Sequence, residues 1–274
     1  MVDEDSAEPH SVSVVVPTRN SSRTLDACLK SIKSQSTCCT LIVVDNGSED
    51  GTLEIAQKYA DVIISRGPER SAQRNAGASL TESYIVGFVD SDMILSPGVV
   101  GEVVGAIRNG AVSVIIPERT IGVGFWANVR AFERDFYRGS DDIEAPRFFL
   151  RSVFDAVGGF DENITGPEDW DLGMRVQKFG KASRIVADID HDEGHVRYLA
   201  ACKKKAYYAQ GIECFLKKHG NEGFDRLSSR PWLSEPRKLA SVLGMGLLAL
   251  KSGEGLAVIS VLLRNKIRER IHQY

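Results

Sequence analysis

Residues 84–93 read YIVGFVDSDM, an apolar stretch that ends in two aspartates. Two earlier stretches have the same form: residues 11–20 read SVSVVVPTRN, and residues 40–48 read TLIVVDNGS. Each contains an apolar run rich in β-branched residues, which is typical of a buried strand, and each continues into polar residues. The three stretches therefore predict buried strands that end in side chains able to bind a ligand.

Strands and helices alternate around these stretches. This alternation predicts an α/β fold with a mostly parallel, doubly wound sheet flanked by helices. We expect strands at 11–16, 40–44, 62–65, 84–89, 111–116 and 183–189, and helices at about 21–35, 51–59, 71–80, 97–109, 169–179 and 196–219. Residues 118–150 show no clean period, and we expect loops and short elements there.

The composition excludes several classes of protein. Of the 274 residues, 43% are hydrophobic and 26% are charged, as in a globular chain with a full core and unlike a disordered, collagenous or coiled-coil chain. The first ten residues, MVDEDSAEPH, do not resemble a secretory signal, and the five cysteines form no C-x-x-C pair. We therefore expect a cytoplasmic protein with reduced thiols.

Charge is distributed unevenly along the chain. Residues 1–196 contain 19 Lys and Arg against 31 Asp and Glu, whereas residues 197–274 contain 15 against 6. The acidic part argues against a general nucleic-acid binder. The basic end suits an anionic partner such as a membrane surface, and the alternative is a solvated helical surface.

The polar strand ends predict a ligand site. In open α/β sheets, ligands bind outside the carboxyl ends of the strands, and three strands here end in polar groups. One aspartate after a strand usually caps a turn, but three such ends at one edge indicate more than capping. Asp90 and Asp92 are two residues apart, and paired carboxylates with substrate phosphates are a common way to hold Mg²⁺.

Common nucleotide and hydrolase motifs are absent from the sequence. It contains no G-x-x-x-x-G-K-[ST], no G-x-G-x-x-G, no G-x-S-x-G and no H-E-x-x-H. The predicted metal and diphosphate site is therefore neither a P-loop nor a dinucleotide fingerprint.

Six stretches, taken together, resemble family 2 glycosyltransferases of the GT-A fold. They follow the family's order and spacing over about residues 12–220. They are VSVVVPTRN (12–20), LIVVDNGSEDGT (41–52), ERSAQRNAGA (69–78), YIVGFVDSDM (84–93), VGGFDENITGPEDWDLGMRVQKFG (157–180) and IDHDEG (189–194).

The resemblance implies an inverting, metal-dependent enzyme of the hexosyltransferase type. It would move a sugar from a UDP- or GDP-linked donor to an acceptor hydroxyl in the assembly of a glycan, a polysaccharide or a lipid-linked oligosaccharide. The implied cofactor is Mg²⁺ or Mn²⁺, and the implied acceptor is a glycan or a polyprenyl-linked sugar.

The resemblance also implies roles for individual residues. Asp169 would be the catalytic base, Asp92 and His191 would contact the metal, and Glu168 and Trp170 would contact the acceptor. Arg74 is a rival to Arg70 as the arginine that contacts the base. The nucleotide sugar would be held by Pro17, Thr18, Asn20, Asp45, Asn46, Arg70, Asp90 and Ser91.

The sequence of Gly166-Pro167-Glu168-Asp169 gives independent support for a base at this position. Proline is favoured in the first turn of a helix, so the two carboxylates would lie at a helix N-terminus that favours their ionised form. Ordinary acidic residues of a first helical turn remain the alternative.

We divide the chain into four parts on this basis. They are a polar N-terminal tail (1–11), a nucleotide-sugar-binding α/β half (12–117), an acceptor-binding and catalytic half (118–220), and a basic and apolar helical C-terminal extension (221–274).

The C-terminal extension contains two apolar runs, 239–250 and 256–263, separated by Lys-Ser-Gly-Glu-Gly. Each run is too short to span a bilayer, and we expect a helical hairpin. Residues 239–270 would contact the cytoplasmic face of a membrane as a peripheral element, with Arg264, Lys266, Arg268 and Arg270 near the headgroups. Packing within the chain and a homodimer interface are the alternatives.

Two other functions fit parts of the pattern. A sugar-phosphate nucleotidyltransferase also uses a doubly wound sheet with a carboxylate-bound metal. However, its first loop is usually glycine-rich, and PTRNSSRT (17–24) contains no glycine. A non-catalytic nucleotide-sugar-binding protein would not need the complete set of acidic motifs.

Overall fold

The computed structural model describes residues 11–141 and 143–271, and the side chains of all of these except 266 and 268–271. The chain forms two compact units. The first contains the described residues up to Arg119 together with Gly139–Glu162 and Asp169–Asp192, and the second contains Thr120–Arg138, Asn163–Glu168 and the described residues from Glu193. Of the predicted N-terminal tail, only residue 11 is described, and the four-part division stays a prediction.

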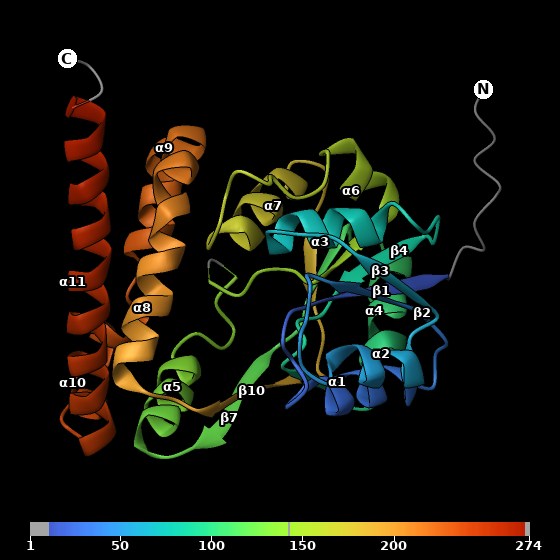
Figure 1. Ribbon diagram of the computed structural model, residues 1–274, viewed down its shortest axis with the longest axis horizontal. Coiled ribbons are helices and arrows are strands. Elements are labelled where there is room, and N and C mark those ends of the chain that lie inside the picture. Colours follow the sequence, from blue (N-terminus) through green and yellow to red (C-terminus); the bar gives the residue numbers. More distant parts are fainter. Residues whose placement is uncertain (1–10, 142, 272–274) are drawn as a thin grey trace. The chain divides into compact units, whose positions relative to one another are not determined.

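A seven-stranded sheet forms the centre of the first unit (Figure 1). The four strands β3, β2, β1 and β4 are parallel to one another, and β8 runs antiparallel between β4 and β6. This confirms the predicted mostly parallel α/β sheet. In spatial order the strands are β3 (Val62–Ser65), β2 (Thr40–Asp45), β1 (Val12–Thr18), β4 (Ile85–Phe88), β8 (Phe148–Leu150), β6 (Ser113–Ile115) and β9 (Ala182–Arg184).

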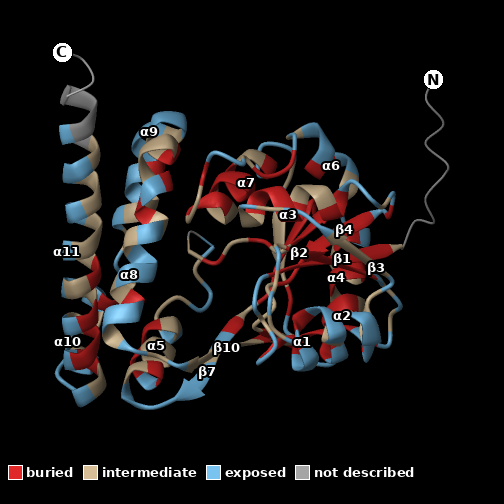
Figure 2. Cartoon of the chain, viewed as in Figure 1, coloured by how far each residue is buried: buried red, intermediate tan, exposed pale blue. Residues whose placement is uncertain are grey.

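Helices cover both faces of this sheet, because successive side chains of a strand point to opposite sides. Val14 and Val16 of β1 pack in one core cluster, and Val15 packs in the other. Figure 2 shows the central strands buried. One face is covered by α1 (Leu25–Lys33), α2 (Thr52–Tyr59) and α4 (Val99–Arg108), and the other by α3 (Arg70–Ala78), α6 (Arg151–Ala156) and α7 (Glu168–Val176).

Helix α3 packs closely on the sheet because of a glycine. A Cβ atom on Gly77 would lie 2.4 Å from a methyl carbon of Val15 and 3.0 Å from one of Val44. The missing side chain therefore lets α3 approach β1 and β2. This brings the polar residues of α3 close to the carboxyl ends of these strands.

A second sheet has three strands, in the order β5 (Met93–Leu95), β10 (Ile189–His195) and β7 (Glu118–Val123). In the antiparallel pairing of β10 with β5, His191 lies opposite Met93. The single strand predicted at 183–189 is therefore wrong in its extent, because β9 ends at Arg184 and β10 begins at Ile189.

The second unit is helical in its larger part and has a core of its own. Val129, Ala201, Trp232, Leu247 and Leu250 form this core. The helix predicted at 196–219 is interrupted, because a short 3₁₀ turn (Ala209–Gly211) separates two helices. The helices are α5 (Phe125–Asp135), α8 (Tyr198–Tyr208), α9 (Ile212–Ser228), the 3₁₀ turn Pro231–Ser234, α10 (Pro236–Leu239) and α11 (Val242–Ile271).

The C-terminal hairpin predicted from the sequence is wrong. The Lys-Ser-Gly-Glu-Gly stretch at 251–255 lies inside α11, which continues through it. The segment Val242–Asn265 is consequently long and apolar enough to cross a membrane, by length and composition only. Of the four C-terminal cations named above, the side chains of Lys266, Arg268 and Arg270 lie outside the described residues.

Candidate active site

The carboxyl ends of β1 and β2 are joined by their own polar side chains. Thr18 and Asp45 are almost completely buried, and the Thr18 hydroxyl donates to Asp45 Oδ1 over 3.4 Å. The backbone N–H and the hydroxyl of Ser48 donate to the two oxygens of Asp45 over 2.8 and 2.5 Å. Asn46 donates its backbone N–H to the Thr18 carbonyl over 2.9 Å. The carboxyl ends of β1 and β2, where the nucleoside is predicted to bind, are therefore held together by a network of hydrogen bonds.

Asn20 holds the loop after β1 against the loop after β2. Its backbone lies in the left-handed region, with φ of 49°, which asparagine tolerates better than most residues. Its N–H donates to Ser48 Oγ over 2.8 Å, and its side-chain oxygen accepts the Glu49 N–H over 2.9 Å. The structure therefore brings together Thr18, Asn20, Asp45 and Asn46, and Pro17 precedes Thr18 at the end of β1.

A fully buried arginine links the end of β4 to the start of α7. Arg74 of α3 donates from Nη2 to Asp90 Oδ1 over 2.7 Å and from Nη1 to Asp169 Oδ1 over 2.9 Å. Its guanidinium also lies over the Phe160 ring, 5.0 Å from the centroid. Asp90 and Asp169 are 79 positions apart in the sequence. Arg74 nevertheless holds both carboxylates at one place.

Arg147 continues this chain of charges on the other side of Asp90. Its Nη1 lies 3.6 Å from Asp90 Oδ2, and its Nε donates to Glu118 Oε1 over 2.6 Å. Burial raises the pKa of the Asp90 carboxyl, but the guanidinium groups of Arg74, Arg147 and Arg70 outweigh this and hold that pKa far below its usual range. The Asp90 carboxyl is thus ionised at neutral pH.

Asp92 and His191 meet at the adjoining edge. His191 Nε2 lies 3.2 Å from Asp92 Oδ2, and His191 Nδ1 lies 3.9 Å from Glu118 Oε2. A backbone hydrogen bond of 2.8 Å from the Asp192 N–H to the Asp92 carbonyl holds the two segments together. The two predicted metal contacts, which are 99 positions apart in the sequence, are therefore neighbours.

This pair suits a divalent metal ion. A carboxylate oxygen and an imidazole nitrogen lie next to each other, and both are common ligands of such ions. Among residues 11–141 and 143–271, no group of three or more His, Cys, Asp or Glu side chains is arranged to hold a metal. The remaining ligands would therefore come from substrate phosphates and water, which is usual for Mg²⁺.

The other predicted residues lie nearby or have structural partners. Ser91 shares a hydrogen bond of 2.8 Å with Ser21, and half-buried Arg70 begins α3. Trp170 donates its indole N–H to the Ile143 carbonyl over 2.9 Å. Glu168 is buried and accepts the Gly166 N–H over 2.6 Å, a contact that caps the start of α7. The assigned roles of these residues stay predictions.

Sequence reasoning missed the arginines that organise the site. It treated Arg74 as a rival for the nucleoside base, whereas the structure places it between two carboxylates. It assigned nothing to Glu118 and Arg147, which lie in the stretch without a clean period. Local spacing contains no signal for these ion pairs, because their partners are 16 to 95 positions away.

A sequence profile of the family described as Glycosyl transferase family 2 matches residues 13–160, more than half of the chain. The chain belongs to this family. The curated relatives that it resembles include glycosyltransferase AglE of Haloferax volcanii, which is 34% identical over 91 residues covering 30% of each chain. Validoxylamine A glucosyltransferase of Streptomyces hygroscopicus subsp. jinggangensis is 27% identical over 218 residues, covering 62% of this chain and 52% of that one.

Solved glycosyltransferase structures have a fold similar to that of this chain. The mannosyltransferase PcManGT of Pyrobaculum calidifontis, solved with GDP-Man and Mn²⁺, has a TM-score of 0.62 at 16% identity. The match covers 95% of this chain and 89% of that one. Glucosyl-3-phosphoglycerate synthase of Mycobacterium tuberculosis, solved with Mn²⁺, UDP and glucosyl-3-phosphoglycerate, has a TM-score of 0.51 at 20% identity, and the match covers 76% of this chain and 79% of that one. These likenesses confirm the predicted GT-A fold.

The present chain spans 27% to 52% of the length of the first three curated relatives that it matches. Because these matches cover only part of the relatives, they establish the family of this chain but not its substrates. Its donor, its acceptor and its reaction are therefore proposed below.

Proposed function

We propose that this chain transfers a sugar from a UDP- or GDP-linked donor to an acceptor hydroxyl, with inversion at the anomeric carbon. The proposed role is the assembly of a glycan, a polysaccharide or a lipid-linked oligosaccharide. The observation that supports it most is the placement of Asp169 and Asp90 on one buried guanidinium, that of Arg74. A candidate base is thereby fixed close to the strand end that carries the Asp90-Ser91-Asp92 motif.

The nucleoside part of the donor would bind at the ends of β1 and β2. Thr18, Asn20 and Asp45 form the hydrogen-bonded rim there, together with Pro17 and Asn46. Rigid groups of this kind lower the cost of ordering a ligand. Arg70, Asp90 and Ser91 would contact the ribose and diphosphate region.

A Mg²⁺ or Mn²⁺ ion would be held by Asp92 and His191. When bound, such an ion neutralises the charge that develops on a nucleoside diphosphate leaving group. The protein itself contributes the orientation of these two side chains. The β5–β10 register, in which His191 is paired with Met93, fixes the imidazole beside the loop that carries Asp92.

Asp169 would act as the general base. An acceptor hydroxyl is a weak nucleophile, and it must lose its proton to a positioned carboxylate as it attacks. The Asp169 side chain is 33% exposed, so a substrate can reach it, and Arg74 restrains one of its oxygens. Glu168 and Trp170 are its neighbours on α7, and they would contact the acceptor.

Two substitutions test this function. Asp169→Asn keeps the shape of the side chain but removes the base, and we expect kcat to fall by a factor of about 10² to 10⁴. Asp92→Asn should raise the concentration of Mn²⁺ that is required for half-maximal transfer. The measurement is nucleoside diphosphate release from UDP- and GDP-linked sugars in the presence of an acceptor library.

Asp135→Asn is the matched control, because Asp135 is an exposed residue near the end of α5. Unchanged transfer by Asp169→Asn would contradict the proposal. Pyrophosphate release from a nucleoside triphosphate and a sugar phosphate would show a nucleotidyltransferase instead. Donor binding without transfer to any acceptor would show a binding protein.

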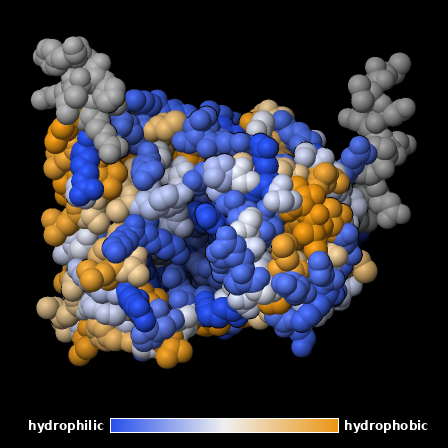
Figure 3. Space-filling view, in the orientation of Figure 1, coloured by the Kyte–Doolittle hydropathy of each residue, from blue (hydrophilic) through white to orange (hydrophobic). Residues whose placement is uncertain are grey.

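We further propose that α11 contacts the cytoplasmic face of a membrane. Its exposed side chains include Leu256, Ile259, Leu263 and Ile267, which recur at intervals of three and four and therefore share one face. Figure 3 shows apolar surface on the side of the view where α11 lies. An exposed apolar helix face followed by exposed Arg264 suits an anionic membrane surface. A homodimer through the same face is the competing outcome.

A further inference from the structure

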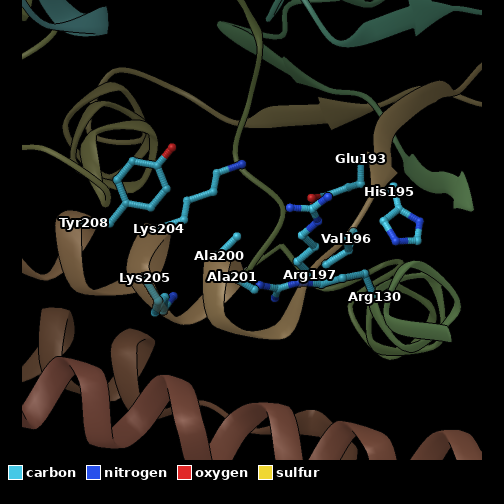
Figure 4. A pocket seen from close by; sticks show the side chains of 10 residues that line it. All are labelled: Arg130, Glu193, His195, Val196, Arg197, Ala200, Ala201, Lys204, Lys205 and Tyr208. Atoms are coloured by element: carbon cyan, nitrogen blue, oxygen red, sulfur yellow. The ribbon is translucent and has the colours of Figure 1, made fainter. Parts of the chain in front are cut away.

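The second unit contains a basic pocket that none of the proposed donor or catalytic residues lines. The cavity has a volume of about 370 Å³, within the range of ligand pockets. Figure 4 shows it with the side chains of Arg197 and Lys204 extending into the same region. Its lining residues are Arg130, Glu193, His195, Val196, Arg197, Ala200, Ala201, Lys204, Lys205 and Tyr208.

The lining carries an excess of positive charge. Four of its side chains are cationic (Arg130, Arg197, Lys204 and Lys205), and Glu193 is the one carboxylate among the lining residues. Among the described residues, Arg197, Lys204 and Lys205 have no ion-pair partner, so their charges are available to a ligand. These three side chains are exposed, so water screens their mutual repulsion, and a bound anion would reduce that repulsion further.

A buried layer of charges behind the pocket explains why Arg130 is held in place. Its guanidinium contacts Glu133 over 3.1 Å and Glu254, and Lys251 contacts the same two carboxylates. Two carboxylates are thus already matched by two cations. The Nε of Arg130 is buried and has no hydrogen-bond partner, so one donor of the pocket wall is unsatisfied.

Lys205 lies next to this layer without a carboxylate of its own. Partial desolvation by the surrounding protein atoms and the neighbouring positive charge of Lys251 lower the pKa of Lys205, although its residue is exposed, and Glu254 and Glu133 act in the opposite direction. An anion in the cavity would stabilise the ammonium form.

The backbone dipoles at the start of α8 add to the positive charge around the pocket. Val196 and Arg197 precede the first turn of α8, Ala200 lies in it, and this turn contains no acidic residue. The first intrahelical bond that begins here runs from the Ala201 N–H to the Arg197 carbonyl, so the earlier N–H groups lie at the positive end of the helix. Such an end favours phosphate groups when side-chain cations are also present.

We propose that this pocket binds a phosphate or diphosphate group, at a site distinct in its residues from the donor site. A cavity of this volume accommodates a diphosphate, and arginine and lysine side chains are the usual donors to phosphate oxygens. The group would be carried either by a prenyl-linked acceptor or by a free phosphate compound. The prenyl-linked source rests on the proposed transfer to a lipid-linked acceptor, whereas binding of the phosphate itself is measured without any transfer.

The experiment is isothermal titration calorimetry on the full chain, in EDTA and without nucleotide. The probes are inorganic pyrophosphate and farnesyl phosphate. We expect pyrophosphate binding that weakens as NaCl is raised. Lys204→Gln and Arg197→Gln should each weaken it about tenfold, the loss expected for one charge-assisted hydrogen bond.

Lys203→Gln is the matched control, because Lys203 is exposed on the same helix and does not line the pocket. Thermal unfolding of each variant tests whether the fold is retained. Farnesyl phosphate that binds more tightly than pyrophosphate, with the same loss in Lys204→Gln, identifies a lipid phosphate as the source. Equal affinities identify a free phosphate. The proposal is overturned when neither probe binds, or when both bind Lys204→Gln and Arg197→Gln as tightly as the unaltered chain.

Discussion

Arg74 is the residue on which the geometry of the site depends. Its side chain is completely inaccessible to solvent, and a buried guanidinium is tolerated only where carboxylates compensate its charge. Asp90 and Asp169 supply that compensation from two different segments. Arg74 therefore acts as a positioning residue, because it decides where the proposed base Asp169 lies.

Replacing Arg74 by lysine tests this role. A single ammonium group cannot reproduce two separate hydrogen bonds in a fixed fork, so Asp169 should lose its orientation while the buried positive charge remains. We expect kcat to fall about 10²-fold, because small displacements of catalytic groups have effects of this size. Transfer kinetics and thermal unfolding are the measurements.

Arg66→Lys provides the comparison, since Arg66 is exposed and precedes α3. A variant Arg74→Lys with unchanged kcat would show that Arg74 is not needed to position Asp169. A change in KM for the donor alone would instead indicate a contact with the nucleotide.

The sequence predicted those parts of the candidate site that depend on local patterns of apolar and polar residues. The polar ends of β1, β2 and β4 were predictable, because apolar runs that end in Asp or Asn mark the carboxyl ends of buried strands. The proximity of Asp92 and His191 came from the family resemblance. The ion pairs of Arg147 with Asp90 and Glu118 depend on the tertiary fold, so no spacing rule indicates them.

At the scale of the elements, Asp50 joins the starts of two helices. Its carboxylate accepts the Ser22 N–H ahead of α1 over 3.1 Å and the Thr52 N–H of α2 over 3.1 Å, and it also accepts the Thr52 hydroxyl. These hydrogen bonds, chiefly that from the Thr52 side chain, lower the pKa of Asp50 to about 2. The loops that carry the proposed nucleoside contacts are thereby tied together.

This pKa predicts a dependence of stability on pH. An unfolded Asp has a pKa of about 3.9, so ionised Asp50 stabilises the fold above about pH 4, and this contribution is lost as the pH falls through about 2. NMR titration of the carboxyl should show a midpoint near 2. Thr52→Val should move the midpoint upward, whereas Thr52→Ser retains the hydroxyl and should leave it low. An ordinary midpoint in the unaltered chain would contradict the prediction.

The continuity of α11 shows how packing can override local preference. Two glycines within three residues predicted a break, yet Gly253 lies where α8 packs against α11. A Cβ atom on Gly253 would lie 2.1 Å from the Tyr198 hydroxyl and 2.9 Å from Cys202 Sγ. Helix α5 escaped prediction for a related reason, because its aromatic residues pack in a core that the sequence does not reveal.

Two alanine substitutions separate these effects. Gly253→Ala should destabilise the protein by about 1–3 kcal/mol, because the new methyl group overlaps the side chains of α8. Gly255→Ala meets no atom within 4 Å and should stabilise the helix by about 0.5–1 kcal/mol. Urea unfolding of both variants measures the two signs. Destabilisation by Gly255→Ala, or tolerance of Gly253→Ala, would show that α11 is not packed on α8 in this way.

At the scale of the whole molecule, the two units have different chemistry. The first has an apolar core on each side of its sheet and holds the candidate donor, metal and base residues. The second has a smaller core, the basic pocket and the exposed face of α11. The residues proposed for catalysis and those proposed to contact an anionic partner are therefore different sets, so substitutions can test each set separately.

The proposed contact of α11 with a membrane can be tested by co-sedimentation with vesicles. Leucines on one helix face that enter the headgroup region contribute through buried apolar area. Replacing both Leu256 and Leu263 by serine should reduce binding to anionic vesicles at least about tenfold, and neutral vesicles should bind the unaltered chain less well. The comparison is a double variant of Leu53 and Leu80, exposed leucines of the first unit, which should bind normally. Sedimentation as a dimer without lipid, lost in the α11 variant, would instead show that a second copy covers this face.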